Sequence, residues 1–379
     1  MSRIEVVVVG HTCIDIIPEF YSGGETLTHV LSPGKLVNIG PLLTATGGVV
    51  PNTGGALQKL GVNTALVGKG GNDVLGRVFQ DLLKSRETNT EHIRISEKDA
   101  TSYTIVVNIP AVDRILLHCP GANDSFGFDD IPFELVEKAK LFHFGYPPLM
   151  KRIFSDGGLE LTRIYQTAKE KGTTTSLDMH RPDPDSPAGK VDWISYLQRV
   201  LPVVDIFMPS IDELVYMINR DHFDEFESKL NSGIAAGGIS KDKLEEYAAR
   251  LINMGAAIVA IKLGDFGLYL QVTEDMQRLG GERFGRASYH LLVDWAGAKI
   301  YSPCFEVELA GALGAGDCTI AGFLAAILHE QPPEAAVLSA TGAGACNVEQ
   351  PDALSGIPSW DQLQERINGD WNKSMLVLV

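Results

Sequence analysis

The chain has 379 residues, of which 45% are apolar and 21% charged, with 39 glycines and 19 prolines. This is ordinary globular composition, and it excludes a disordered, collagen-like or small disulfide-stapled protein. The formal net charge of −16 repels nucleic-acid backbones and anionic lipid surfaces, so we expect neither a nucleic-acid partner nor a membrane partner.

Short β-branched runs that are apolar on both faces recur along the chain. In order they are residues 6–9, 65–67, 141–144, 174–177, 206–208 and 258–261. Helical patterns lie between them. One begins at the N-cap candidate Ser240 and continues at helical spacing with Leu244, Tyr247, Ala248 and Leu251. Because strands apolar on both faces belong to a parallel sheet covered by helices on each side, we predict a doubly wound, mostly parallel α/β fold.

Two stretches break this alternation. Residues 16–45 are rich in turn residues, and residues 101–120 alternate with a period of two around 110–113, which predicts an antiparallel hairpin. We expect the two stretches to form a small sheet that stands off the main one. Residues 220–240 combine acidic residues with the run NSGIAAGG and are expected to be an insertion or a mobile loop.

The cysteines and the N-terminal segment bear on the compartment. The five cysteines are scattered and form no C-x-x-C pair, which favours reduced thiols over a disulfide framework or a zinc site. Glu5 interrupts the apolar region that a signal peptide needs. No stretch approaches the roughly 18 to 20 uninterrupted apolar residues of a membrane span. We therefore expect a cytoplasmic protein.

The strongest chemical motif is Gly314-Ala315-Gly316-Asp317, which precedes the apolar helical run 318–328. Small residues that open a helix leave backbone N–H groups free to cradle an anion, and the helix dipole adds partial positive charge. Asp317 would lie beside that anion, which suits a general base that takes a proton from a hydroxyl attacking a phosphoryl group. On local grounds alone, an Asp that only stabilises the helix dipole is equally well supported.

A second motif, the segment GGVVPN from Gly47 to Asn52, leads into a helix that ends near residues 60–61. Paired glycines such as Gly47 and Gly48 let the backbone approach a ligand closely, and the Asn52 amide offers a donor and an acceptor to sugar hydroxyls. A plain turn with an N-cap Asn is the alternative. Asp15 follows the first strand at the edge where open α/β sheets bind ligands, although a lone Asp there is more often a turn residue.

Two glycine-containing segments do not match the nucleotide-binding signatures that they suggest. Residues 68–76 superficially resemble a P-loop, but Lys69 is not followed by Ser or Thr. Gly10 is followed by no second glycine at the spacing of the dinucleotide-binding fold, so a dinucleotide-dependent oxidoreductase lacks its fingerprint.

Taken in order, these segments resemble the PfkB/ribokinase family of carbohydrate kinases over nearly the whole chain. The matching segments are VVVVGHTCID, GGVVPNTGGALQKLG, VGKGGNDVLG, DRILLHCPGAN, DIFMPSIDE, KLGDFG and LGAGDCTIAGFLAAIL. The resemblance implies a single ribokinase-like kinase domain over residues 1–379, with a small β lid made by the excursions 16–45 and 101–120. It also implies that the protein transfers a phosphoryl group from ATP, with Mg²⁺, to a hydroxymethyl group of a small sugar.

The functional residues of the family carry over position by position. By this resemblance Asp317 is the catalytic base, and the anion hole for the transferring phosphoryl group is made by Gly314, Ala315 and Gly316. The sugar-contacting positions are Asp15, Gly47, Gly48 and Asn52. On the nucleotide side, the family's phosphate-bordering loop corresponds to KLGDFG, with Lys262 and Gly264, and an adenine-side position corresponds to Thr341. Glu213 corresponds to the end of the family's Asn-x-x-Glu motif, which organises Mg²⁺ and phosphate through water.

The sequence departs from the family pattern on the nucleotide side. Ser210 replaces the Asn at the head of the Asn-x-x-Glu motif, and its shorter side chain is compatible with a water-mediated contact and weaker nucleotide binding. Gly311 and Ala312 replace an Asp-Thr pair whose carboxylate helps to bind a monovalent cation in many members. The resemblance therefore does not carry potassium activation over to this chain.

The acceptor is not identified by these residues. Gly145-Tyr146 replaces the acidic or amide residue that several sugar kinases carry after the strand 141–144, and Tyr146 could offer its ring to a substrate or simply pack. Arg181 could face an anionic substrate group, and a histidine such as His11 is more often structural. A nucleoside or vitamin kinase of the same fold is therefore one alternative.

A catalytically weak sugar- or nucleotide-binding regulator is a second alternative, motivated by Ser210 and Gly311. A homodimer formed through the lid, which is a habit of the family, is a further hypothesis.

Overall fold

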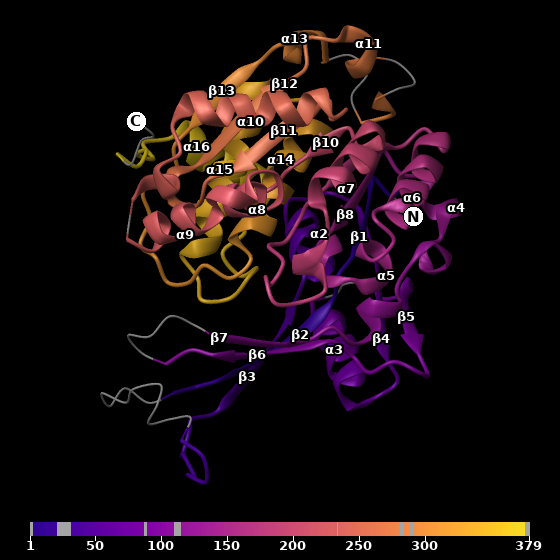
Figure 1. The fold of residues 1–379 in the computed structure, drawn as a ribbon, viewed down its shortest axis with the longest axis vertical. Coiled ribbons are helices and arrows are strands. Elements are labelled where there is room, and N and C mark those ends of the chain that lie inside the picture. The colour runs from indigo at the N-terminus through magenta and orange to yellow at the C-terminus, as the bar shows by residue number, and fades with distance from the viewer. Residues whose placement is uncertain are drawn as a thin grey trace.

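The computed structural model describes residues 3–20, 32–86, 89–109, 115–232, 234–280, 284–287 and 292–375. Within these residues, nine strands form a central sheet (Figure 1) in the order β13 (Lys299–Ser302), β12 (Leu268–Val272), β11 (Ile258–Lys262), β10 (Ile206–Phe207), β9 (Thr174–Leu177), β8 (Leu141–Gly145), β1 (Val6–Gly10), β4 (Thr64–Gly71) and β5 (Ile93–Ser96). Neighbouring strands are parallel except that β12 is antiparallel to both β11 and β13. All six predicted runs coincide with these strands, with 206–208 extending one residue past β10, so the predicted fold class is confirmed.

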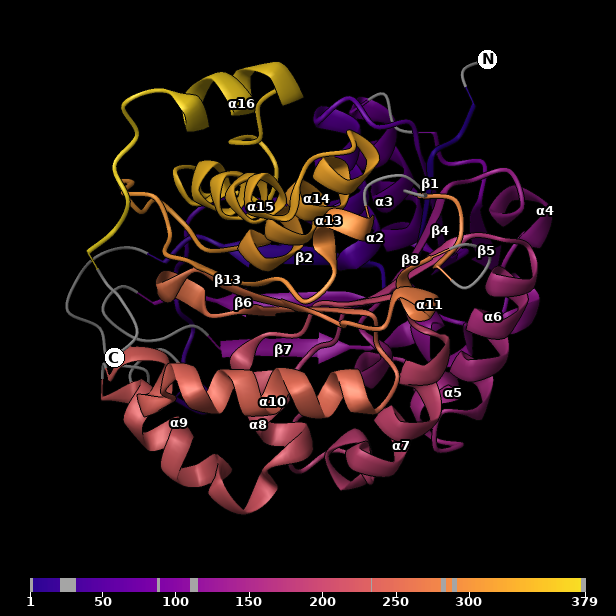
Figure 2. The same cartoon turned by 90° about the horizontal axis from the view of Figure 1, so that it is seen from above.

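Helices cover both faces of the central sheet (Figure 2). Because side chains alternate along a strand, Val7 and Val9 of β1 pack in one core cluster, whereas Val6 and Val8 pack in another on the opposite face. The first cluster includes residues of α4 (Phe133–Val136), α5 (Lys151–Phe154), α6 (Leu159–Glu170), α7 (Trp193–Val200), α8 (Ile211–Ile218), α9 (Phe223–Asn231) and α10 (Lys241–Asn253). The second includes residues of α2 (Val49–Lys59), α3 (Val74–Ser85), α11 (Met276–Leu279), α13 (Leu292–Trp295), α14 (Ala315–Leu328), α15 (Pro333–Val348) and α16 (Trp360–Asn368).

A second, four-stranded sheet stands off the main body (Figure 1). Its strands lie in the order β3 (Leu42–Gly47), β2 (Cys13–Pro18), β6 (Tyr103–Val107) and β7 (Ile115–Cys119). We call it the small sheet. Strands β6 and β7 pair antiparallel, which confirms the predicted hairpin, although residues 110–114 lie outside the described residues. The two ends of the segment 16–45 lie in β2 and β3, and residues 21–31 between them also lie outside the described residues.

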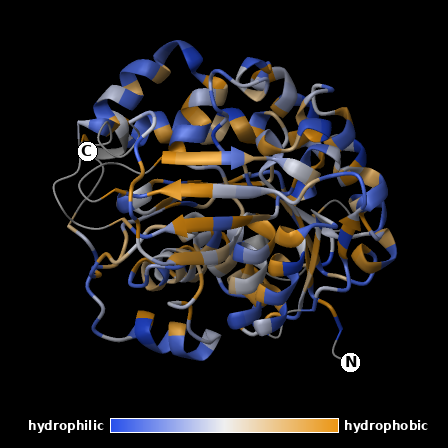
Figure 3. Cartoon of the chain, turned by 90° about the horizontal axis from the view of Figure 1, so that it is seen from below, coloured by the Kyte–Doolittle hydropathy of each residue, from blue (hydrophilic) through white to orange (hydrophobic). Residues whose placement is uncertain are grey.

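The edge strands of the small sheet carry exposed leucines. Leu42 and Leu43 of β3 are 58% and 56% exposed, and Leu116 and Leu117 of β7 are 52% and 53% exposed. Figure 3, which views the molecule from the side of the small sheet, shows hydrophobic colouring along its strands. Edge strands with exposed apolar residues offer unpaired backbone groups and an apolar surface for association.

Two further local predictions can be compared with the structure. The helix predicted from Ser240 is confirmed, because the Ser240 side chain accepts a hydrogen bond from the backbone N–H of Lys243 at the start of α10. The prediction of a loop over residues 220–240 is wrong, because that region contains α9, which buries Phe223 and Phe226. All five cysteines are free thiols. Among the helices of the described residues, none is long and apolar enough to cross a membrane.

Candidate active site

The motif at 314–317 forms the start of α14. Gly314 is the N-cap residue and has a left-handed backbone, with φ of 73°, a conformation that strongly favours glycine. Asp317 lies in the first turn and is only 3% exposed. The first backbone N–H groups of a helix have no partner within it, so this turn offers donors to an anion beside a buried carboxylate, as the sequence predicts.

The Asp317 carboxylate is held by three side-chain donors. Thr53 Oγ1 donates to Asp317 Oδ1 over 2.9 Å, while Asn52 Nδ2 and the Tyr146 hydroxyl donate to Oδ2 over 3.1 and 2.9 Å. Asn52 and Thr53 lie in the first turns of α2, where the N-cap is Gly48, so the alternative of an N-cap Asn is wrong. Thr53 was not predicted as a site residue, because a threonine inside an apolar helix gives no local signal.

Asp15 lies beside Gly47, on the small sheet. It belongs to β2 and pairs in register with Ala45 of β3, so it is not a turn residue. A Cβ atom at Gly47 would collide with the Asp15 carboxylate, and one at Gly48 would lie 2.6 Å from Nδ1 of His11. The paired glycines are therefore required by the close approach of their own neighbours.

Aromatic side chains and histidines surround this region. Nε2 of His11 lies 3.4 Å from Nε2 of His118 on β7, and Nδ1 of His118 is 3.0 Å from Thr104 Oγ1. The Tyr146 ring lies 5.9 Å from the His11 ring and 5.1 Å from the His180 ring, centroid to centroid. Burial lowers the pKa of His11, and it lowers that of His118 to about 4. Both imidazoles are therefore neutral at neutral pH.

Of the nucleotide-side candidates, Lys262 lies at the end of β11 and Glu213 in the first turn of α8, near enough for Glu213 to raise the pKa of Lys262. Lys262 Nζ lies 2.7 Å from Asp178 Oδ1 in a buried ion pair. Burial by itself lowers the pKa of Lys262, but Asp178 and Glu213 outweigh it and raise the value to about 12. Burial raises the pKa of both carboxyl groups, Asp178 and Glu213. A Cβ atom built on Gly316 would lie 3.6 Å from Lys262 Nζ, so this ammonium lies close to the turn that opens α14.

The remaining predicted residues differ in what they offer to a ligand. The Ser210 hydroxyl donates to Asp212, and its backbone N–H donates to Glu213 Oε2. Gly264 has open space around it, because a Cβ atom there would meet nothing within 4 Å. Thr341 is buried in α15, where its hydroxyl donates to the Val337 carbonyl of the same helix.

Arg181 forms an ion pair with Glu227, with 2.8 Å between Nη1 and Oε1. The ion pair at the site is instead the one between Asp178 and Lys262, and the sequence did not single out Asp178 as the partner of Lys262.

Two buried polar atoms at this site have no hydrogen-bond partner. Among the described residues, the buried side-chain atoms without a partner are His11 Nδ1, Asn52 Oδ1, His143 Nε2 and Asn347 Oδ1. Leaving such a group unpaired costs roughly 1–3 kcal/mol, and native structures contain few of them. His11 Nδ1 borders Gly48, and Asn52 Oδ1 belongs to the amide whose Nδ2 donates to Asp317. Unpaired polar atoms are expected where ligand hydroxyls complete the hydrogen bonding.

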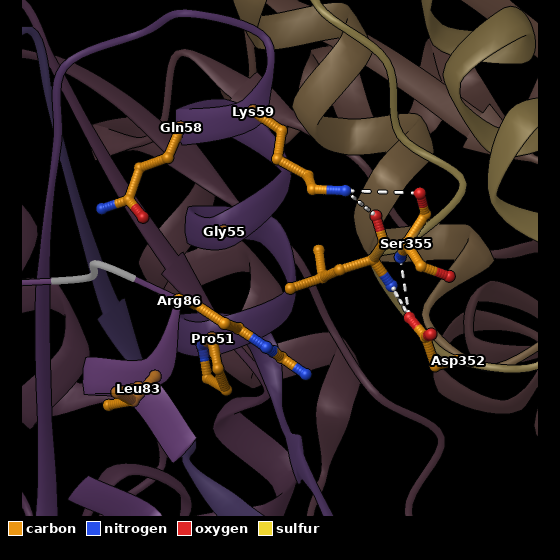
Figure 4. A pocket seen from close by; sticks show the side chains of 9 residues that line it. Pro51, Gly55, Gln58, Lys59, Leu83, Arg86, Asp352 and Ser355 are labelled. Atoms are coloured by element: carbon orange, nitrogen blue, oxygen red, sulfur yellow. Dashed lines mark hydrogen bonds between the residues drawn. The ribbon is translucent and has the colours of Figure 1, made fainter. Parts of the chain in front are cut away.

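The far face of α2 borders a cavity of about 420 Å³ (Figure 4). There Lys59 Nζ donates to the carbonyl oxygens of Leu354, Ser355 and Ile357, over 2.8, 3.3 and 3.3 Å. The loop that these residues belong to also backs the start of α14, because Cys318 Sγ donates to the carbonyl oxygen of Ala353 over 3.3 Å. Lys59 therefore ties α2 to the loop behind the 314–317 turn.

Comparison with known proteins places this chain in a family. The model of the pfkB family carbohydrate kinases matches residues 3–360. Probable fructokinase-7 of Arabidopsis thaliana is 22% identical over 376 residues, which cover 97% of this chain and 93% of that protein. An uncharacterized sugar kinase of Archaeoglobus fulgidus is 22% identical over 302 residues, covering 80% of this chain and 98% of that protein.

Solved structures show the same fold. The structure of Arabidopsis thaliana ribokinase complexed with ribose and ATP superposes with a TM-score of 0.71 at 18% identity, covering 98% of this chain and 100% of that one. The nucleoside kinase of Methanocaldococcus jannaschii superposes with a TM-score of 0.63 at 17% identity, covering 97% and 99%. The chain has the ribokinase fold, belongs to the pfkB family of carbohydrate kinases, and is accordingly a phosphotransferase.

Proposed function

We propose that this kinase transfers the terminal phosphoryl group of ATP to a hydroxymethyl group of a small neutral sugar, with Asp317 as the general base. The observation that carries the proposal is the position of Asp317, a buried carboxylate beside the free N–H groups of the first turn of α14. A base and an anion cradle within one helical turn suit the deprotonation of a hydroxyl next to a transferring phosphoryl group.

The proposed reaction follows from this arrangement. Asp317 takes the proton of the sugar hydroxyl, the sugar oxygen forms a bond to the terminal phosphorus, and the bond from that phosphorus to the bridging oxygen breaks, which releases ADP. The backbone N–H groups of the turn Gly314 to Gly316 stabilise the charge on the transferring group. Lys262 adds a permanent positive charge near the same turn, since its pKa lies well above neutral pH.

ATP and Mg²⁺ fit the residues on the nucleotide side. The kinase structures that resemble this chain include ribokinase complexed with ATP and a putative ribokinase II from E. coli in complex with ATP and Mg²⁺. Mg²⁺ is usually held by one or two carboxylates together with substrate phosphates. Glu213 could supply such a carboxylate through water, and no group of three or more His, Cys, Asp or Glu residues in the described parts of the chain forms a cage for a metal ion. Gly264 and Ser210 would border the phosphates, and Thr341 the adenine side.

The acceptor side favours a neutral polyol. Asp15 and the unpartnered Asn52 Oδ1 accept hydrogen bonds from hydroxyl groups, whereas the neutral His11 provides an unpartnered ring nitrogen. The ring pair Tyr146 and His180 also offers an aromatic wall. That wall keeps a nucleoside acceptor as the second candidate, and turnover of D-fructose, D-ribose and adenosine side by side separates the two.

The small sheet is proposed to act as a lid on a single kinase domain and as a dimer interface. Because Asp15 lies on β2 and His118 on β7, movement of this sheet would carry two acceptor-side groups toward Asp317. Closure would exclude water, so that the phosphoryl group reaches the sugar instead of solvent. The exposed leucines of β3 and β7 support homodimerisation through the same sheet.

The ADP released from Mg-ATP in the presence of each sugar tests the proposed function. Ligand-induced stabilisation without any ADP would favour a binding regulator instead.

A further inference from the structure

Tyr146 is the most exposed of the three donors to Asp317. The three donors to that carboxylate differ in burial: Thr53 and Asn52 are 0% and 4% exposed, whereas Tyr146 is partly exposed. Asp317 itself is 3% exposed. Of the three donors, Tyr146 is therefore the one with contact to solvent, whereas Asn52 and Thr53 hold the carboxylate from within α2.

The Tyr146 hydroxyl donates a hydrogen bond to the Asp317 carboxylate, as the hydroxyl of a sugar acceptor would. It donates to Asp317 Oδ2 over 2.9 Å, within the range of hydrogen bonds from a hydroxyl but at its long end. Asn52 Nδ2 donates to the same oxygen. A carboxylate oxygen accepts about two hydrogen bonds, so Oδ2 has no remaining place for the hydroxyl of a sugar while Tyr146 stays there.

We propose that the Tyr146 hydroxyl occupies the place on Asp317 Oδ2 that the acceptor hydroxyl takes, and that Tyr146 moves off the carboxylate when the acceptor binds. The inference rests on the proposed role of Asp317. Tyr146 is then a residue that sets acceptor affinity, since an acceptor hydroxyl must displace this internal hydroxyl before it can bind Oδ2.

The backbone of Tyr146 is suited to such a movement. Tyr146 has a left-handed backbone, with φ of 66°, and Glu330 is the other non-glycine residue with positive φ among those the structure describes. A left-handed non-glycine residue is strained, and such strain persists where surrounding contacts hold it. Here the hydrogen bond to Asp317 and the rings of His11 and His180 hold Tyr146. Release of the hydroxyl removes one of these contacts.

A competing internal donor lowers the apparent affinity for the acceptor, because only the fraction of molecules with the carboxylate uncovered can bind it. Removing the hydroxyl while keeping the ring removes the competition. Tyr146→Phe should therefore bind the acceptor about fivefold more tightly, the factor that corresponds to a net hydrogen bond of about 1 kcal/mol.

The test is a calorimetric titration of wild type and Tyr146→Phe with D-fructose, D-ribose and adenosine in the absence of nucleotide. Tyr165→Phe is the matched control, because the Tyr165 hydroxyl donates to the buried Ser176 carbonyl, away from Asp317. The same titrations are followed by ultraviolet difference absorption in the tyrosine band, which reports loss of the bond from Tyr146 to the carboxylate.

We expect tighter binding of at least one of these compounds by Tyr146→Phe, together with a difference band that appears in wild type and Tyr165→Phe and is missing from Tyr146→Phe. Equal or weaker binding of all three compounds, no binding by either protein, or a band that persists without the Tyr146 hydroxyl overturns the proposal. Turnover of Asp317→Asn is measured separately and decides the proposed function, because the titrations involve no phosphoryl transfer.

Discussion

The Lys262 ammonium lies 2.7 Å from the Asp178 carboxylate in a buried ion pair whose side chains are 11% and 1% exposed. The two residues are 84 positions apart in the chain, and the pair joins the ends of β9 and β11 beside the turn that opens α14. The positive charge of Lys262, close to the turn that opens α14, is therefore held by a carboxylate from a neighbouring part of the sheet.

Removing Lys262 should have two separable effects. Lys262→Met leaves Asp178 as a buried lone carboxylate, which typically costs about 3 kcal/mol of unfolding free energy, and it removes a charge from the phosphate side. We expect lower stability by urea titration and weaker ATP binding by calorimetry. In the double variant Lys262→Met/Asp178→Leu, stability should recover while ATP binding stays weak. ATP binding at the wild-type level by Lys262→Met would exclude Lys262 from the nucleotide site.

The buried His143 should make the fold sensitive to acid. Burial lowers its pKa to about 3, whereas the unfolded chain has an ordinary value near 6.5. Between these values the unfolded state binds more protons, so stability falls as pH is lowered through this window, by about 1.4 kcal/mol per pH unit for one proton. Urea titrations between pH 4 and pH 6 should give a shallower pH dependence for His143→Gln than for wild type. Equal slopes would show that His143 does not contribute.

The Lys59 ammonium should stabilise the loop behind the active-site turn. Lys59→Met removes the ammonium donor from three carbonyl groups, of which that of Leu354 keeps a donor in the Ile357 N–H, and we expect a loss of about 1–3 kcal/mol of unfolding free energy. We also expect lower kcat, because the same loop contacts Cys318 of α14. Lys84→Met is the control, since Lys84 is exposed on α3. If Lys59→Met matches that control in thermal melting and turnover, the proposed support of the loop is wrong.

The apolar edge of the small sheet should hold two copies of the chain together. Light scattering at micromolar concentration is expected to give the mass of a dimer for wild type and of a monomer for the double variant Leu116→Asp/Leu117→Asp. Leu159→Asp is the control, because Leu159 is 59% exposed on α6, outside the small sheet. A monomer mass for wild type would exclude this interface.

The sequence predicts much of the fold because its signals are local. Strands that are apolar on both faces indicate a covered parallel sheet, and period-two alternation indicates the hairpin of β6 and β7. The α9 helix was missed because acidic residues and a neighbouring glycine run obscured the helical spacing of Phe223 and Phe226. Local patterns therefore located an element where its hydrophobic periodicity was uninterrupted, and missed α9, where other residues interrupted it.

The candidate site residues could be proposed from the sequence only where a motif marks them. The glycine turns and Asp317 have such motifs, and the structure brings Asn52 to Asp317. The bond from Tyr146 to Asp317 joins residues 171 positions apart, and nothing in the segment around Tyr146 specifies that partner. Such contacts depend on how the strands are ordered in the sheet, which a single sequence does not encode in any local pattern.

The most direct test of the account is the ADP released from Mg-ATP by wild type and Asp317→Asn with D-fructose, D-ribose and adenosine as acceptors. We predict turnover on a sugar by wild type, and a kcat at least about 100-fold lower for Asp317→Asn, which is the low end of general-base contributions. ATP binding measured by calorimetry should be largely kept in the variant. Near-normal turnover by Asp317→Asn would contradict the assignment of the base, and no ADP with any acceptor would contradict the proposed reaction.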